Sequence, residues 1–207
     1  MDDKLEIVSP DGEFSITYFK GYQELESLDI LNKFVKGVEK VVRTSGPYSR
    51  YIAHLKEDLG LDYCQKHPNI HDGDGSIGHH IEMHHGPLFT LFDYCMIITT
   101  ALIKRGERVT TFTVADYIMR EHFDDHIQTI MLCQNCHYAD HSTYNEIVNS
   151  LKFCFQDVQE FFDLWGDGID SETLPYIENN LEILYRTDAY DIGLLQPTIP
   201  QKWGNDY

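Results

Sequence analysis

The sequence predicts an α+β protein that is mostly helical, with a β-hairpin near the N-terminus and two further short strands. Residues 4–19 alternate apolar and polar side chains around Pro10-Asp11-Gly12, a pattern typical of a β-hairpin. Several longer stretches repeat apolar residues at helical spacing. Two short apolar segments, 80–84 and 127–132, suit strands, and each leads into a group of histidines.

The helices follow in chain order. Leucines and valines recur at helical spacing over 21–43, and Gly46-Pro47 is expected to end that helix. Further helices are predicted over about 48–59, 88–104 and 114–123, the last with Thr113 as its N-cap. Three more are predicted over about 134–154, 156–165 and 171–186. The chain then divides into an N-terminal hairpin with helices (1–60), a central core (61–145) and acidic C-terminal helices (146–207).

The composition predicts a soluble protein with a sizeable core. The chain has 207 residues, of which 42% are hydrophobic, and no apolar run approaches the ~20 residues of a membrane helix. The first residues lack the basic and apolar regions of a signal peptide, so we expect a cytoplasmic location, in the host cell if the protein is viral. The five cysteines suit thiols or metal ligands better than a disulfide framework.

The net charge of -18 argues against simple binding of nucleic acid. DNA-binding proteins gain much of their affinity from lysine and arginine, which neutralise phosphates. Residues 151–207 hold 11 of the 34 acidic residues, so the charge is partly segregated. An acidic face can either keep the protein soluble or mimic DNA toward a basic partner.

Two histidine groups carry most of the functional information. The predicted strand 80–84 ends at His84 and is followed directly by His85, and neighbours on a strand point to opposite faces. His137 and His141 lie four residues apart, so on a helix they share one face and can hold one metal ion. A histidine kept off the metal titrates near neutrality and can deprotonate water. A bound metal ion and a free imidazole are the minimum for metal-assisted hydrolysis of a phosphodiester.

The motif resembles the HNH (His-Me finger) endonucleases. Glu-x-His-His followed by Leu-Cys-x-x-Cys-His-x-x-x-His carries the resemblance, over about residues 62–145. It is most similar to small HNH-like proteins of bacteriophages, which also begin a helix with a motif like Pro87–Asp93 after the paired histidines. The resemblance implies a ββα-metal core, in which two strands and a helix clamp one divalent ion.

The resemblance also assigns roles to individual residues. His84, His137 and His141 would hold Mg²⁺, Mn²⁺ or Zn²⁺, and His85 would be the general base. The family usually has an asparagine that orients the base, and this chain has Gln128 in its place, with His126 as an alternative occupant. The substrate implied is DNA.

A second metal site is predicted for a structural zinc ion. Many HNH proteins hold such an ion between two Cys-x-x-Cys pairs. This chain has Cys133-x-x-Cys136 and, upstream, Cys64-x-x-His67, and a set of three cysteines and one histidine suits zinc. Zinc would explain how the pattern-poor segment 61–79 becomes ordered.

The residues leave three functions open. The leading hypothesis is a metal-dependent endonuclease that hydrolyses DNA. The alternative is a catalytically silent, HNH-derived phage protein that binds and inhibits a host protein, in the manner of a DNA mimic. The third is a structural module held only by its zinc ligands. The apolar helices are also compatible with a dimer.

Overall fold

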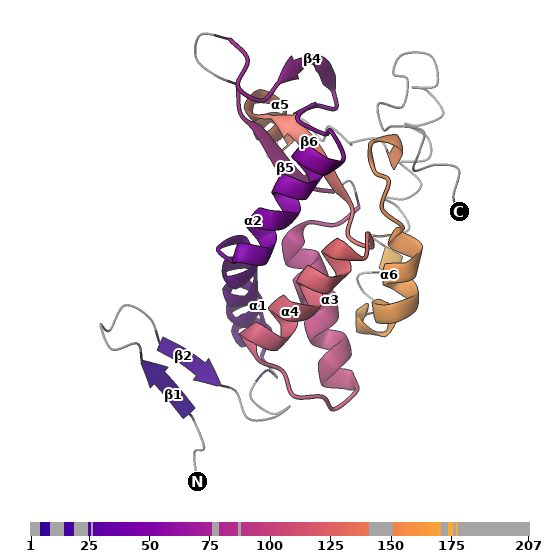
Figure 1. Cartoon of the computed structure of the whole chain (residues 1–207). Helices are drawn as coiled ribbons and strands as arrows, with labels where there is room; N and C mark the ends of the chain where they lie inside the picture. Colours follow the sequence, from indigo (N-terminus) through magenta and orange to yellow (C-terminus); the bar gives the residue numbers. More distant parts are fainter. Residues whose placement is uncertain are drawn as a thin grey trace.

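The protein is an α+β fold in which helices dominate, as the sequence predicts. The structure is a computed structural model that describes residues 5–8, 15–18, 25, 27–75, 79–86, 88–140, 151–170, 174–175 and 177. Helices α1, α3 and α4 pack together, and strands β5 and β6 with helix α5 lie at one end of this helical group (Figure 1). Buried apolar residues from Leu25 to Ile177 form one core cluster. The division into three sequence segments stays a prediction.

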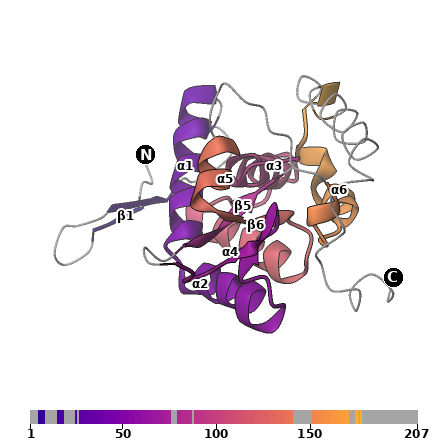
Figure 2. The same ribbon diagram turned by 90° about the horizontal axis from the view of Figure 1, so that it is seen from above.

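Two strands near the N-terminus form the predicted hairpin. β1 (Leu5–Val8) pairs antiparallel with β2 (Ser15–Tyr18), with Leu5 opposite Tyr18. The hairpin projects from the rest of the molecule in both views (Figures 1 and 2).

Helix α1 (Leu28–Arg43) is amphipathic. The Ser27 hydroxyl caps it by accepting a hydrogen bond from the backbone N–H of Ile30, which explains why it begins later than the predicted residue 21. Its buried face consists of Phe34, Val35, Val38 and Val42. This face packs on α3 (Leu91–Lys104) and α4 (Thr111–Phe123).

The other helix boundaries follow from local capping. α2 (Gly46–Ala53) begins behind the N-cap Ser45 with Pro47 in its first turn, and a π-helical turn over His54–Asp58 extends it to the predicted end. Thr90 and Asp93 form a capping box at the start of α3. α4 begins three residues earlier than expected because Thr110, rather than Thr113, is the N-cap.

Segment 61–79 contains more regular structure than the sequence predicts. β3 (Tyr63–Cys64) and β4 (His67–His71) form a short antiparallel hairpin. The buried Gln65 in its turn attaches the hairpin to β6. The backbone N–H of Gln65 donates to the carbonyl of Met131 (2.9 Å), and its side-chain oxygen accepts from the N–H of Met131 (2.6 Å). Side-chain hydrogen bonds of this kind leave no periodic pattern in a sequence.

The predicted pair of strands forms the centre of the candidate functional region. β5 (Ile81–His85) and β6 (Thr129–Cys133) are antiparallel, with Ile81 opposite Cys133 and His85 opposite Thr129. α5 (Gln134–Asp140) follows β6 directly, so these elements have the ββα order that the resemblance implies. α3 and α4 occupy the connection between the two strands.

The C-terminal part differs from its prediction. Of the helix expected over 134–154, the structure describes Gln134–Asp140 as helix, and Leu151–Phe153 is a 3-10 turn. α6 (Val158–Trp165) and the 3-10 turn Gly166–Gly168 follow, and both contact α3. Residues 141–150 and most of the helix predicted over 171–186 lie outside the described residues.

Candidate metal centre and histidine cluster

Four predicted zinc ligands come together where the β3–β4 hairpin meets the end of β6 and the start of α5. Cys64 and His67 flank the turn between β3 and β4, Cys133 ends β6, and Cys136 lies in α5. The ligand atoms of all four residues lie within 4.8 Å of one another. The His67 Nδ1 atom is 3.2 Å from the Cys136 Sγ and 3.9 Å from the Cys64 Sγ.

These distances suit a tetrahedral zinc ion. Zinc bonds of about 2.3 Å to sulfur and 2.0–2.1 Å to nitrogen place neighbouring ligand atoms roughly 3.6–3.8 Å apart. The donor set is three thiols and one imidazole, three of them on buried residues. The Cys64, His67, Cys133 and Cys136 cluster, called the Cys/His cluster below, can therefore hold a metal ion such as zinc.

The thiols of the Cys/His cluster have unequal acidities. Burial raises the pKa of the Cys133 thiol, but hydrogen bonds from the backbone N–H groups of Cys136 and Asn135 and from nearby thiols lower it by more. Burial and the neighbouring sulfurs raise the pKa of Cys136 to about 12. One thiol is therefore predisposed to act as a thiolate ligand, whereas a bound cation would have to displace the proton of the other.

On the α5 face of β5, three side chains that can act as ligands lie together. The rings of His84 and His137 meet edge to face with their centroids 5.2 Å apart. The Glu82 carboxylate accepts a short hydrogen bond from Nδ1 of His137, which leaves Nε2 of His137 as the nitrogen able to bind a metal. Two imidazoles that share one ion have ring centroids about 5 Å apart, given metal–nitrogen bonds of 2.0–2.1 Å.

Gly86 leaves room for the His84 ring. Its φ of +152° lies in a region that side chains disfavour, and a Cβ at this position would be 3.3 Å from the Nε2 atom of His84. The chain can therefore turn directly behind the paired histidines without displacing the ring. His141, the remaining predicted ligand, lies outside the described residues.

His85 points to the opposite face of β5 and into the protein. It is 5% exposed, and its ring stacks on Tyr48 with centroids 6.1 Å apart and an interplanar angle of 9°. Its Nε2 atom lies 3.0 Å from Nε2 of the fully buried His122 in α4. His84 and His85 therefore face different partners, as their alternation on a strand requires.

The hydrogen bonds determine the proton positions on this histidine pair. The Ile118 carbonyl can only accept, so Nδ1 of His122 carries the proton donated to it over 2.7 Å. Burial lowers the pKa of His122 to about 4 and that of His85 well below its usual value, so both rings are neutral near pH 7. His122 Nε2 then accepts a hydrogen bond from His85 Nε2, and His85 Nδ1 keeps a lone pair.

Gln128 and His126 have other contacts. The Gln128 side-chain oxygen is buried with no hydrogen-bond partner among the described residues, and its backbone N–H donates to the Tyr94 hydroxyl. His126 pairs with Glu121 through Nδ1 at 2.7 Å. His85 donates its hydrogen bond to His122 rather than to Gln128, so the catalytic role of Gln128 stays a prediction.

Sequence reasoning assigned no role to His122 or to Glu82, the glutamate of the Glu-x-His-His motif. Glu82 stands two residues before His84, and alternation along a strand places both on one face. His122 lies four residues after Ile118 and eight after Val114, on the apolar face of the predicted helix 114–123. A histidine at such a position on a helix is a local signal, but its pairing with His85 depends on tertiary contacts.

The comparisons with known proteins identify the family. A family model described as "Bacteriophage G278-like virion protein" matches residues 1–193. This chain belongs to that family. No curated protein and no solved structure matches the chain. The bacteriophage origin implied by the resemblance is supported, whereas membership of the HNH endonucleases remains a proposal. Within the described part of this virion-family protein, every helix is too short or too polar to cross a membrane.

Proposed function

We propose that this phage virion-family protein is a metal-dependent endonuclease of the HNH type that hydrolyses phosphodiester bonds of DNA. His84 and His137, with His141, would hold the divalent ion. His85 would take a proton from the attacking water. The Cys/His cluster would hold a structural zinc ion beside this centre.

One observation carries the proposal: the β5–β6–α5 unit brings His84 and His137 into ring contact and leaves His85 on the other face of the same strand. His84 and His137 are 53 positions apart, yet both belong to the motif that suggested the function. Surface histidines placed by chance on a strand and a helix have no reason to meet at a spacing that fits a shared ion.

The protonation pattern of the histidine pair suits His85 for its role. A bound divalent ion would stabilise the developing charge on the phosphate and on the leaving oxygen. His85 Nδ1 has the lone pair needed to accept a proton from water while the water oxygen bonds to phosphorus and the bond from phosphorus to the leaving oxygen breaks. His122 would position His85 by accepting the hydrogen bond from its Nε2.

Three observations favour a catalytically silent protein as the second candidate. His85 is only 5% exposed, and the Gln128 side-chain oxygen has no hydrogen-bond partner in the described region. The net charge of -18 also favours a basic protein partner over DNA. In this case zinc would stabilise a binding module of the virion or an inhibitor of a host protein.

A plasmid-cleavage assay with Mg²⁺, Mn²⁺ or Zn²⁺ separates the two candidates. We expect the parent protein to cut DNA and His85→Ala to abolish cleavage without changing the far-UV circular dichroism spectrum or the metal content. His54→Ala is the matched control because its partner is Asp58, outside the proposed site. Cleavage by His85→Ala at the parent rate would remove His85 from the mechanism. An inactive parent that binds a basic protein tightly would favour the silent candidate.

A further inference from the structure

We propose that the exposed face of α1, continued by Arg50 of α2, binds the phosphate backbone of DNA beside His85. We call this face, made of Lys33, Lys36, Lys40, Arg43 and Arg50, the basic ridge. The inference rests on the proposed function, because it supplies the DNA-binding surface that an acidic endonuclease needs.

The spacing of the basic residues places them on one side of α1. Lys33, Lys36, Lys40 and Arg43 follow one another at intervals of three, four and three residues, which keeps them on a single helix face. The opposite face is the buried one that packs on α3 and α4. The ridge is therefore held by a rigid part of the core.

The charges of the ridge are available to a ligand. All five basic residues are exposed. Lys33 and Arg43 make i,i+4 ion pairs with Asp29 and Glu39. Ion pairs on the surface contribute little to stability, so these two basic residues can exchange their partners for other anions. No ion pair within the described residues involves Lys36 or Lys40.

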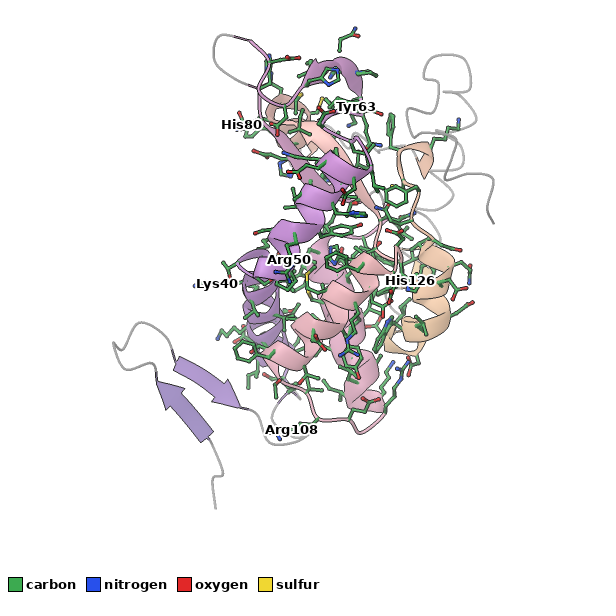
Figure 3. All side chains as sticks on the ribbon, in the orientation of Figure 1. Lys40, Arg50, Tyr63, His80, Arg108 and His126 are labelled. Atoms are coloured by element: carbon green, nitrogen blue, oxygen red, sulfur yellow. The ribbon has the colours of Figure 1, made fainter. Side chains whose placement is uncertain are left out.

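The ridge ends next to the histidine pair. The Arg43 Nη1 atom is 3.5 Å from the Tyr48 hydroxyl, and the Tyr48 ring stacks on His85. The Arg50 Nη1 atom lies 3.4 Å from the point where a Cβ on Gly46 would be, so its guanidinium group folds back toward the α1–α2 junction. Figure 3 shows Lys40 and Arg50 near this junction. A strand bound along the ridge would thus pass close to the proposed general base.

The local charge favours a polyanion as the ligand. Residues 33–50 contain five basic residues and one acidic residue, a balance of +4 in a chain whose total is -18. Lys36 and Arg43 are seven residues apart, about 10 Å along the helix axis, so the ridge can contact several phosphates of one strand. The neighbouring acidic surface would repel DNA elsewhere and restrict it to this face.

Fluorescence anisotropy with a labelled DNA duplex tests the ridge. The full-length, zinc-loaded protein is titrated at several KCl concentrations without added Mg²⁺ or Mn²⁺. We expect Lys36→Gln with Lys40→Gln to weaken binding by about tenfold at low salt and to reduce the salt slope by about two, one for each lost phosphate contact. Arg108→Gln with Arg120→Gln is the matched control, since it removes the same charge; Arg108 lies at the other end of the helical group (Figure 3).

The outcomes separate this inference from the proposed function. The inference is wrong if the parent does not bind DNA, if the ridge variant binds with the parent's affinity and salt slope, or if the control variant loses as much affinity. Cleavage is measured in parallel. Ridge-dependent binding without cleavage would reject the nuclease and keep the ridge, whereas cleavage that is indifferent to the ridge substitutions would reject the ridge and keep the nuclease.

Discussion

The Cys/His cluster and the histidines of β5 both adjoin the β5–β6 sheet but are built in different ways. In the Cys/His cluster, four ligand atoms converge within 4.8 Å and form a closed set. Around β5, His84 and His137 meet on one face, while His85 pairs with His122 on the other. Closed four-ligand sites are typical of structural zinc, and catalytic sites keep a position for water or substrate. The comparison therefore distinguishes a candidate structural metal site from the region proposed to perform chemistry.

The sharpest test of this separation is to remove a ligand of the Cys/His cluster. We expect Cys133→Ser to lose the zinc ion and to lower the melting temperature by about 10–20 °C, because binding of structural zinc contributes several kcal/mol to folding. Differential scanning calorimetry gives the melting temperature, and inductively coupled plasma mass spectrometry gives the zinc content.

Cys154→Ser is the matched control for Cys133→Ser. The Cys154 thiol donates a hydrogen bond to the Gly86 carbonyl at 3.4 Å and lies outside the Cys/His cluster. The control should keep its zinc and nearly all of its stability. A Cys133→Ser protein that retains both stoichiometric zinc and the parent's melting temperature would show that the cluster is not a structural metal site.

The two regions also differ in how far their sequence reveals them. Each half of the Cys/His cluster is a local motif, with two ligands separated by two residues, and the sequence predicted all four members. The strands β5 and β6 and the helices α3 and α6 were likewise predicted to within a few residues. Local spacing and capping determine these features, so they can be read before the fold is known.

Features that depend on tertiary contacts escaped prediction. The β3–β4 hairpin is attached by the buried Gln65, whose amide bonds the backbone of Met131 and the carbonyl of Phe153. The His85–His122 hydrogen bond joins a strand to a helix 37 residues away. The spacing of these residues in the sequence predicts neither contact. The resemblance directed attention to Gln128 instead, although its side-chain oxygen makes no hydrogen bond in the described residues.

A smaller effect is expected on the histidine side from His122→Phe. The substitution fills a similar volume but removes the acceptor for the Nε2–H group of the buried His85. An unsatisfied buried donor costs about 1–3 kcal/mol in free energy of unfolding, measurable by urea denaturation. If the proposed function holds, cleavage should fall by about a hundredfold through loss of general-base catalysis. The zinc content should not change, which distinguishes this variant from Cys133→Ser.

Nitrogen-15 NMR of the imidazoles gives a readout of His122→Phe that does not depend on activity. In the parent, His85 should be a single neutral tautomer with its proton on Nε2, and the substitution should release a mixture of tautomers. His122→Gln offers an amide oxygen as a replacement acceptor and should restore part of the preference. An unchanged tautomer in His122→Phe would mean that His122 does not position His85.

The smallest expected effect concerns Asp72, which lies between the two regions. Its carboxylate accepts from the N–H of Ile81 at the start of β5 (3.0 Å) and from Lys56 (2.7 Å). Burial raises the pKa of Asp72, but these hydrogen bonds and the Lys56 charge outweigh it, so the pKa lies below its ordinary 3.8. A carboxyl whose pKa is lowered by folding stabilises the fold above its unfolded pKa. That contribution is lost as the pH falls through the lower folded value.

Asp72→Asn should therefore destabilise the protein by no more than about 1 kcal/mol at pH 6, because the Asp72 side chain is 33% exposed and solvent screens the pair. The difference in free energy of unfolding between Asp72→Asn and the parent, obtained from urea unfolding, should shrink below pH 4. Release of zinc in acid would affect both proteins alike. Lys56→Met completes a double-mutant cycle that isolates the ion pair. A difference that stays constant from pH 6 to pH 3 would mean that the Asp72 charge does not join β4 to β5.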